Sequence, residues 1–189
     1  MGSTPTRFTT QHTHIPNMKY ITTHSGRQLD PLAPRIEDIH IGDIAHSLAH
    51  LCRFAGHTHQ FYSVAEHSVR VSFLVDDRAG LHALLHDATE AYLVDVPTPL
   101  KALLPQYREI EKRLNATICA AFDIEPDTYK EEVKKADLEM CAAEVRDLMP
   151  IGDYGLIGVR PDPTFIVPWT VANARELFLT RFNQLRRDE

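Results

Sequence analysis

The sequence predicts an all-α protein, a bundle of helices with a small β element at its periphery. In several separate segments, apolar residues recur at the spacing of one face of a helix. Short stretches rich in proline or glycine separate these segments. The clearest strand composition is in residues 19–25, a β-branched and aromatic stretch that Gly26 follows. Helices joined by short breaks are typical of a bundle around one core.

Three helices are predicted in the first half of the chain. The first covers residues 43–56, with Asp43 as its N-cap and a glycine at its end. The second covers residues 63–75 and begins with a capping box, a serine followed three positions later by a glutamate. The third covers residues 80–92, and the proline-containing stretch 96–99 ends it.

The second half of the chain has the same helical character. An apolar stripe covers residues 107–122, and a long helix over residues 127–148 is charged outside and rich in Ala, Met and Leu inside. The stretch 150–168 contains three glycines and four prolines, which predicts a loop or a segment with short strands. A final amphipathic helix covers residues 171–185.

Composition disfavours several classes of protein. The 189 residues suit one compact domain, expected over residues 18–189, preceded by a polar and flexible extension over residues 1–17. The net charge of −6 disfavours binding to a nucleic-acid polymer, and no apolar run is long enough for a transmembrane helix. The three cysteines are widely spaced, and the sequence starts without the apolar core of a secretory signal. We therefore expect a cytoplasmic protein without a membrane partner.

Two of the 11 histidines accompany carboxylates on predicted helices. His86 and Asp87 are adjacent in an apolar helix, and Glu90 follows on the same flank. His67 lies in the preceding helix and Asp137 in the long one. A buried carboxylate without a partner is costly, so these groups require hydrogen bonds or a metal ion. The four side chains other than Glu90 can converge on one divalent ion, and a hydrogen-bonded pair on a helix face is the alternative.

Three strings give the pattern a family resemblance. They are SVAEHSVRVS at 63–72, LLHDATEAYLVDVPTPLK at 84–101 and KKADLEM at 134–140. Together they resemble the HD-domain metal-dependent phosphohydrolases, and more narrowly the bacterial 5′-deoxynucleotidases and the related HD nucleotide hydrolases of phages and prophages. The resemblance covers about residues 53–148 and implies that the domain over residues 18–189 is an HD-type helical bundle.

The resemblance also implies a metal centre and a catalytic group. The cofactor is a divalent cation, one of Co, Mn, Zn, Fe, Ni or Mg. Its implied ligands are His67, His86, Asp87 and Asp137. Glu90 matches the carboxylate regarded as the catalytic acid or base. Asp95 matches a second carboxylate of the site, near the substrate sugar or the attacking water.

Substrate contacts are implied on both sides of these motifs. Arg53 would hold the phosphate and Phe54 would lie near the sugar or base. The family pattern has Trp at the Phe54 position, and the spacing to His67 is one residue shorter here, which puts base and sugar selectivity in question. Lys101 could add a second positive charge, or it could be a solvated surface lysine. His82 could flank the site or lie on the helix surface.

The expected reaction follows from these residue types. A divalent ion polarises a phosphoryl oxygen and lowers the pKa of water, and an arginine binds non-bridging oxygens bidentately. We expect hydrolysis of a small-molecule substrate, a deoxynucleoside 5′-monophosphate, to nucleoside and phosphate. One alternative is a deoxynucleoside triphosphohydrolase that releases tripolyphosphate, for example from dATP as in some phages. Another is a non-enzymatic nucleotide- or metal-binding regulator. The scarcity of Lys and Arg near the motifs favours one phosphate, and the resemblance implies a homodimer or higher homo-oligomer.

Overall fold

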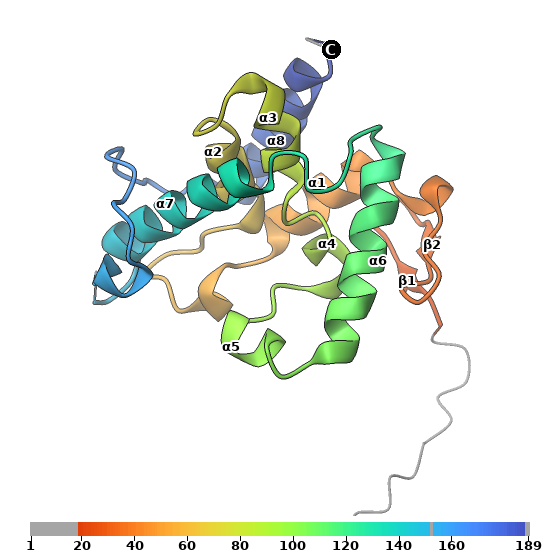
Figure 1. The fold of residues 1–189 in the computed structure, drawn as a ribbon, viewed down its shortest axis with the longest axis horizontal. Coiled ribbons are helices and arrows are strands. Elements are labelled where there is room, and N and C mark those ends of the chain that lie inside the picture. Colours follow the sequence, from red (N-terminus) through yellow and green to blue (C-terminus); the bar gives the residue numbers. More distant parts are fainter. Residues whose placement is uncertain (1–18, 152, 188–189) are drawn as a thin grey trace, which may run out of the picture.

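The computed structural model describes residues 19–151 and 153–187 and is predominantly helical (Figure 1). The polar extension predicted over residues 1–17 lies outside the described residues. The helices are α1 (Ile41–His50), α2 (Val64–Ser72), α3 (Asp77–Leu85), α4 (Glu90–Leu93), α5 (Thr98–Lys101), α6 (Pro105–Ala121), α7 (Lys130–Leu148) and α8 (Val171–Leu185).

A two-stranded antiparallel sheet is the β element at the edge of the bundle. Strand β1 (Ile21–Thr22) pairs with β2 (Gln28–Leu29), so that Ile21 stands opposite Leu29. Short 3₁₀ segments cover Ile36–Asp38, Phe54–Gly56 and Tyr154–Ile157. The predicted all-α fold with a small peripheral β element is therefore confirmed. No helix of the described part is both long and apolar enough to cross a bilayer.

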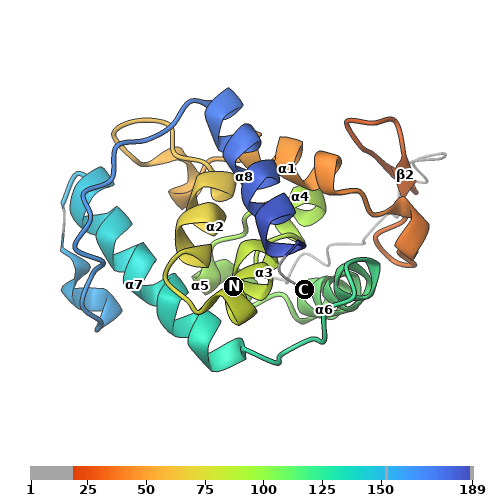
Figure 2. The ribbon, with the colours of Figure 1, turned by 90° about the horizontal axis from the view of Figure 1, so that it is seen from above.

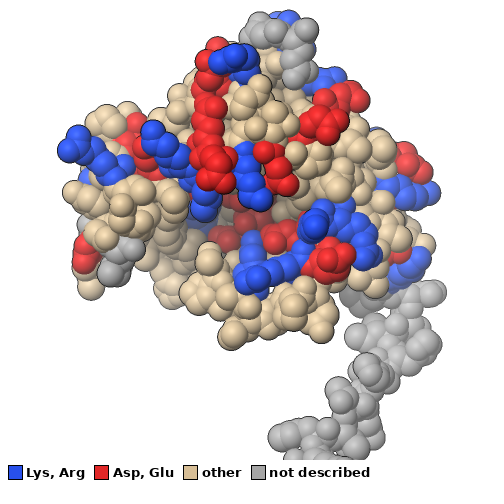
Figure 3. Space-filling model, viewed as in Figure 1, with Lys and Arg blue, Asp and Glu red and all other residues tan. Residues whose placement is uncertain are grey.

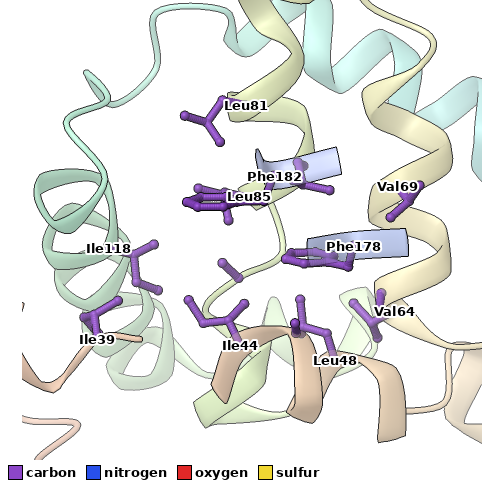
Figure 4. Packing of buried hydrophobic residues seen from close by; sticks show 14 of the residues in the cluster. Ile39, Ile44, Leu48, Val64, Val69, Leu81, Leu85, Ile118, Phe178 and Phe182 are labelled. Carbon is purple, nitrogen blue, oxygen red and sulfur yellow. The ribbon is translucent and has the colours of Figure 1, made fainter. Parts of the chain in front are cut away.

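The main core lies between α1, α2, α3 and α8. Seen from above, the hairpin and α7 stand at opposite ends of the molecule, with these four helices between them (Figure 2). Phe178 of α8 lies beside Leu48 of α1 and Val64 of α2 in the interior (Figure 4). Gly80 of α3 permits close packing of α8, because a Cβ there would stand 2.5 Å from Cδ2 of Leu185. A smaller cluster, which includes Val71, Ala83, Val133 and Met140, packs α7 against α2 and α3.

Helix α2 begins as its capping box predicts. The Ser63 side chain accepts a hydrogen bond from the Glu66 backbone N–H at 3.1 Å. The Glu66 carboxylate does not accept the second hydrogen bond of a capping box, which would come from the Ser63 backbone N–H. This carboxylate is fully buried and accepts from the Arg70 guanidinium and from the Trp169 backbone N–H. The helix ends at Ser72 rather than Val75.

The predicted N-cap role of Asp43 is wrong. Helix α1 begins two residues earlier, at Ile41, and ends at His50 rather than at Gly56. The Asp43 carboxylate instead accepts hydrogen bonds of 2.7–2.8 Å from the Thr23 hydroxyl and from the Ser25 hydroxyl and backbone N–H, on the turn between β1 and β2. Burial opposes ionisation of Asp43, but these hydrogen bonds outweigh it and hold the pKa of the carboxyl below its ordinary value. This aspartate fastens the hairpin to α1.

The helix predicted over residues 80–92 is also wrong, because it is broken in the middle. Helix α3 runs from Asp77 to Leu85, and α4 begins at Glu90. Between them, the Ala88 N–H donates to the Leu85 carbonyl and the Glu90 N–H donates to the Asp87 carbonyl, both at 3.0 Å. These short-range bonds form a tight turn. His86 and Asp87 therefore project from a turn rather than from the side of a helix.

Helices α6, α7 and α8 agree closely with the predictions, whereas the short helix α5 begins within the stretch 96–99 that was predicted as a break. Helix α7 starts at Lys130 instead of residue 127, where the chain passes through a left-handed conformation at Asp127 (φ +63°). Helix α8 covers residues 171–185 as predicted, with the Thr170 side chain as its N-cap.

Candidate metal centre

Side chains from three segments converge at one point, as the sequence predicts. His67 comes from α2, His86 from the turn after α3, and Asp137 from α7. His67 Nε2 lies 3.3 Å from both His86 Nε2 and Asp137 Oδ1. Asp87, the fourth predicted ligand, lies beside this group of three, with its Oδ2 3.2 Å from His86 Nε2 and 3.7 Å from His67 Nε2. Donor atoms bound to one ion at about 2.1 Å stand roughly 3–3.5 Å apart, so the 3.2 and 3.3 Å spacings fit a single metal ion. The spacings of 3.7 Å from Asp87 to His67 and 4.0 Å between His86 Nε2 and Asp137 Oδ1 are wider and would have to shorten on binding.

The hydrogen bonds of the two imidazoles orient their Nε2 lone pairs toward the same point. His67 Nδ1 donates to the Glu144 carboxylate at 2.6 Å, and His86 Nδ1 donates to the Ala83 carbonyl at 2.7 Å. Because both partners are acceptors, each neutral ring carries its proton on Nδ1 and a lone pair on Nε2. Two such lone pairs 3.3 Å apart repel unless a proton or a metal ion lies between them. His67, His86 and Asp137 can therefore hold a metal ion.

The electrostatics of the group favour a cation in the same place. Burial disfavours the charged form of His86, but the Asp87 and Asp137 carboxylates outweigh it and raise the pKa of the imidazole to about 9. Burial likewise opposes ionisation of both aspartates, yet the histidines hold the pKa of each carboxyl well below its usual range. Lys134 contributes a hydrogen bond of 2.7 Å to Asp137 Oδ2. The carboxylates thus stay ionised beside a position that attracts positive charge.

Glu144 is the residue of this site that the sequence analysis missed. Its side chain is fully buried and lies between two functional groups, with Oε1 on His67 and Oε2 accepting from Arg53 Nε at 3.0 Å. Burial opposes ionisation of Glu144, but Arg53 and His67 hold the pKa of its carboxyl below its ordinary value. The available signal was its position on α7, seven residues after Asp137 and therefore on the same helix face.

Arg53 reaches the edge of the centre from the loop before α2. Its side chain is only 12% exposed, and its guanidinium lies 3.6 Å from Asp87 Oδ2 in addition to its bond with Glu144. The next two residues, Phe54 and Ala55, both have left-handed backbones, with φ near +50°. The Phe54 ring lies 5.4 Å from the Arg53 guanidinium carbon. The structure thus places Arg53 at the site, with Phe54 stacked against it.

Glu90 and Asp95 lie near the predicted ligands. Glu90 is buried at the start of α4, and among the described residues its Oε2 has no hydrogen-bond partner. Burial and the neighbouring Asp87 and Asp95 carboxylates raise the pKa of Glu90 to about 9. Burial also raises the pKa of Asp95. Asp95 follows Val94, a β-branched residue held at φ +61°, and such strained positions cluster at functional sites.

Lys101 is not the solvated surface lysine that one sequence-based interpretation gives. It is three-quarters buried, and its Nζ forms an ion pair of 2.7 Å with Glu111 on α6. A solvated surface lysine is therefore wrong. The second positive charge exists, but Glu111 neutralises it.

Two cavities adjoin the centre, and both include His86 and Asp87 in their walls. One has a volume of about 290 Å³ and lies between α3, α6 and α7. The other, of about 260 Å³, is lined by polar residues of α6, including Arg108 and Lys112. The space-filling view shows a hollow with acidic side chains at its floor and both basic and acidic ones around its rim (Figure 3).

Fold and site together define a class, a helical bundle with a histidine–carboxylate centre that can hold a metal ion. No family model matches the chain. It is 42% identical over 172 residues to "Uncharacterized protein YfdR" of Escherichia coli (strain K12), an alignment that covers 89% of this chain and 96% of YfdR. It is 37% identical over 157 residues to "Uncharacterized protein RCAP_rcc00048" of Rhodobacter capsulatus, covering 75% of this chain and 80% of that protein. The chain belongs to the YfdR family.

Proposed function

We propose that the protein is a metal-dependent phosphohydrolase of the HD type that cleaves deoxynucleoside 5′-monophosphates to nucleoside and phosphate. The observation that carries the proposal is the pair of facing Nε2 atoms of His67 and His86, 3.3 Å apart with both Nδ1 atoms engaged by oxygen acceptors. A group built in this way suits a cation, which is the proton of a charged His86 in the ion-free chain and a metal ion when one is bound. The nearby Asp87, Asp137 and Arg53 side chains supply what phosphoryl chemistry needs.

Each residue has a definite part in the proposed reaction. His67, His86, Asp87 and Asp137 would hold the ion, which when bound supplies Lewis acidity toward a phosphoryl oxygen and acidifies water. Arg53 would bind non-bridging phosphate oxygens through the part of its guanidinium that Glu144 leaves available.

Proton transfer falls to the carboxylates beyond the ligands. Glu90 would carry a proton to the leaving oxygen, and Asp95 would orient the attacking water or a sugar hydroxyl. We propose that the protein acts in the cytoplasm, on a small molecule rather than a nucleic-acid polymer, and as a homodimer or higher homo-oligomer.

Deoxynucleoside triphosphate hydrolysis is a second candidate, and one observation favours it. Folding brings Arg108 and Lys112 of α6 into the wall of a cavity that also contains His86 and Asp87. The sequence-based argument for a single phosphate rested on a scarcity of cations, and the structure supplies two more. These cations are suitable partners for distal phosphates.

The test is hydrolysis by purified protein of each deoxynucleoside mono- and triphosphate with Mn, Co or Zn, with phosphate and tripolyphosphate separated as products. We expect phosphate from a monophosphate, and a loss of about 10²–10⁴-fold in Glu90→Gln with metal content unchanged. The matched control is Glu139→Gln, which removes a charge from α7. Among the described residues, the Glu139 carboxylate pairs with Lys135 alone. Release of tripolyphosphate would select the second candidate. Absence of any product would favour the non-enzymatic regulator and overturn the proposal.

A further inference from the structure

The cavity of about 290 Å³ beside the centre has two chemically different ends. At one end its wall contains His86, Asp87 and Asp137. Away from these residues an aliphatic part of the wall lies next to polar and charged side chains, among them Asp127, Lys130 and Lys134. Its apolar members are Leu85, Ile118, Ile124 and Val133. We call this space the α6–α7 cavity. Its volume is near the lower end of the range for small-molecule sites, roughly 300 Å³.

Asn115 marks the junction between the two ends. It lies on α6 and lines both the α6–α7 cavity and the smaller polar cavity beside it. The residue is half-buried, and no other described residue is hydrogen-bonded to its side-chain amide. An amide offers two donors and an acceptor, which suits the mixed donor and acceptor edge of a heteroaromatic ring. Tyr129, packed edge-on against His82, supplies an aromatic side to the same cavity.

The α6–α7 cavity is less suited to phosphate groups. The two lysines at its rim already form ion pairs, Lys130 with Asp127 at 3.3 Å and Lys134 with Asp137 at 2.7 Å. Aliphatic walls do not compensate for the dehydration of a phosphate, whereas they do favour burial of a planar base. Phe54, for which the family resemblance implies a place near the sugar or base, does not line this cavity.

We propose that the α6–α7 cavity holds the nucleobase of the substrate, with Asn115 hydrogen-bonded to the edge of the base and the phosphate at the metal centre. The inference rests on the proposed function for the identity of the ligand. It assigns base selection mainly to Asn115 and Ile118 of α6 and Val133 of α7, which lie outside the three strings that carry the family resemblance for metal and phosphate.

The test compares a deoxynucleoside 5′-monophosphate with 2-deoxyribose 5-phosphate, which has the same sugar and phosphate but no base. Asn115→Trp, which fills the cavity mouth, should lower kcat/KM for the nucleotide by about tenfold or more, mainly through KM. Hydrolysis of 2-deoxyribose 5-phosphate should change by less than about twofold. Asn115→Leu should alter the order of preference among the four bases. Thr117→Leu, a similar change on α6 outside the cavity, is the matched control.

Equal losses on both substrates, or no loss on either, would overturn the inference. A second measurement keeps it separate from the proposed function. Binding of each deoxynucleoside, which has a base but no phosphate, is measured by calorimetry at millimolar concentration. Binding by the wild-type protein that Asn115→Trp abolishes supports the cavity even if no phosphate ester is hydrolysed. If the wild-type protein binds none of the four, the inference fails even if hydrolysis is found.

Discussion

Replacing Glu144 by glutamine should weaken the metal centre without removing any ligand. The carboxylate accepts from His67 Nδ1 and from Arg53 Nε at the same time. A glutamine of nearly the same shape has one acceptor oxygen and one NH₂ group, so it can accept from only one of these donors. If the NH₂ group faces His67, the ring must move its proton to Nε2, which removes the lone pair that a metal ion needs.

The expected magnitudes follow from the burial and number of these contacts. Glu144 is fully buried, and loss of one hydrogen bond to a charged partner costs about 1.5–3 kcal/mol of folding free energy. Changes to a group that orients a ligating histidine typically lower metal affinity by about 10–100-fold, which corresponds to about 1.4–2.7 kcal/mol. Glu144→Gln should therefore show both effects.

Titration with Mn, Co or Zn by calorimetry measures the affinity, and thermal unfolding in chelator measures the stability of the ion-free chain. Glu66→Gln is the matched control. Glu66 is also a fully buried carboxylate that pairs with an arginine, but its partners, Arg70 and the Trp169 backbone, are not part of the centre. The Glu66→Gln variant should be less stable than the wild-type protein and should bind metal with unchanged affinity. If Glu144→Gln loses stability but its affinity falls less than about threefold, Glu144 does not set the His67 tautomer and the reasoning is refuted.

Further changes test other parts of the structure. A chelator should lower the melting temperature of the wild-type protein, and added metal should restore it, because an ion that binds only the folded chain stabilises it. In His86→Ala the chelator should have no effect. If the chelator lowers the melting temperature of His86→Ala as much as that of wild type, His86 is not part of a metal site. Val94→Gly should not lower the melting temperature. The change relieves about 1–3 kcal/mol of strain at φ +61°, which offsets the entropy that glycine adds to the unfolded chain. A clear drop in melting temperature would show that the backbone at residue 94 is unstrained. Asp43→Asn should be less stable than wild type at pH 7. Because the folded pKa of Asp43 lies below its unfolded value near 3.8, this stabilisation is present above pH 4 and is lost as pH falls through the folded pKa, so the two unfolding curves should converge in acid. A constant difference down to pH 2 would exclude the carboxylate as its source.

The helices and the proposed ligands were predictable because their signals are local. The apolar periodicity of α8 and the capping serine of α2 are each contained in a few neighbouring residues. The His86–Asp87 pair is adjacent in sequence, and it was identified although the helix assigned to it was wrong. The wrong helix bounds therefore did not affect the prediction that His86 lies close to His67 and Asp137.

The failures have a common physical origin in contacts between distant segments. The sequence favours Asp43 as an N-cap because a polar residue just before the first apolar position of a helix is the usual cap. In the structure, a hairpin 18–20 residues away supplies the hydrogen-bond donors to its carboxylate. The importance of Glu144 depends on an arginine 91 residues earlier in the chain. In the same way, the basic side chains of α6 reach the neighbourhood of His86 only through packing. Periodicity and propensity contain no information about such pairings.

The position of the centre between the two hydrophobic clusters has a consequence for how the protein responds to its surroundings. Helix α7 belongs to the smaller cluster, and it carries both Asp137 and Glu144. An ion shared between α7, α2 and the turn after α3 would act as a removable cross-link across this boundary. The supply of metal would then set how often α7 separates from the rest of the bundle, and amide hydrogen exchange along α7 would report the concentration of available metal.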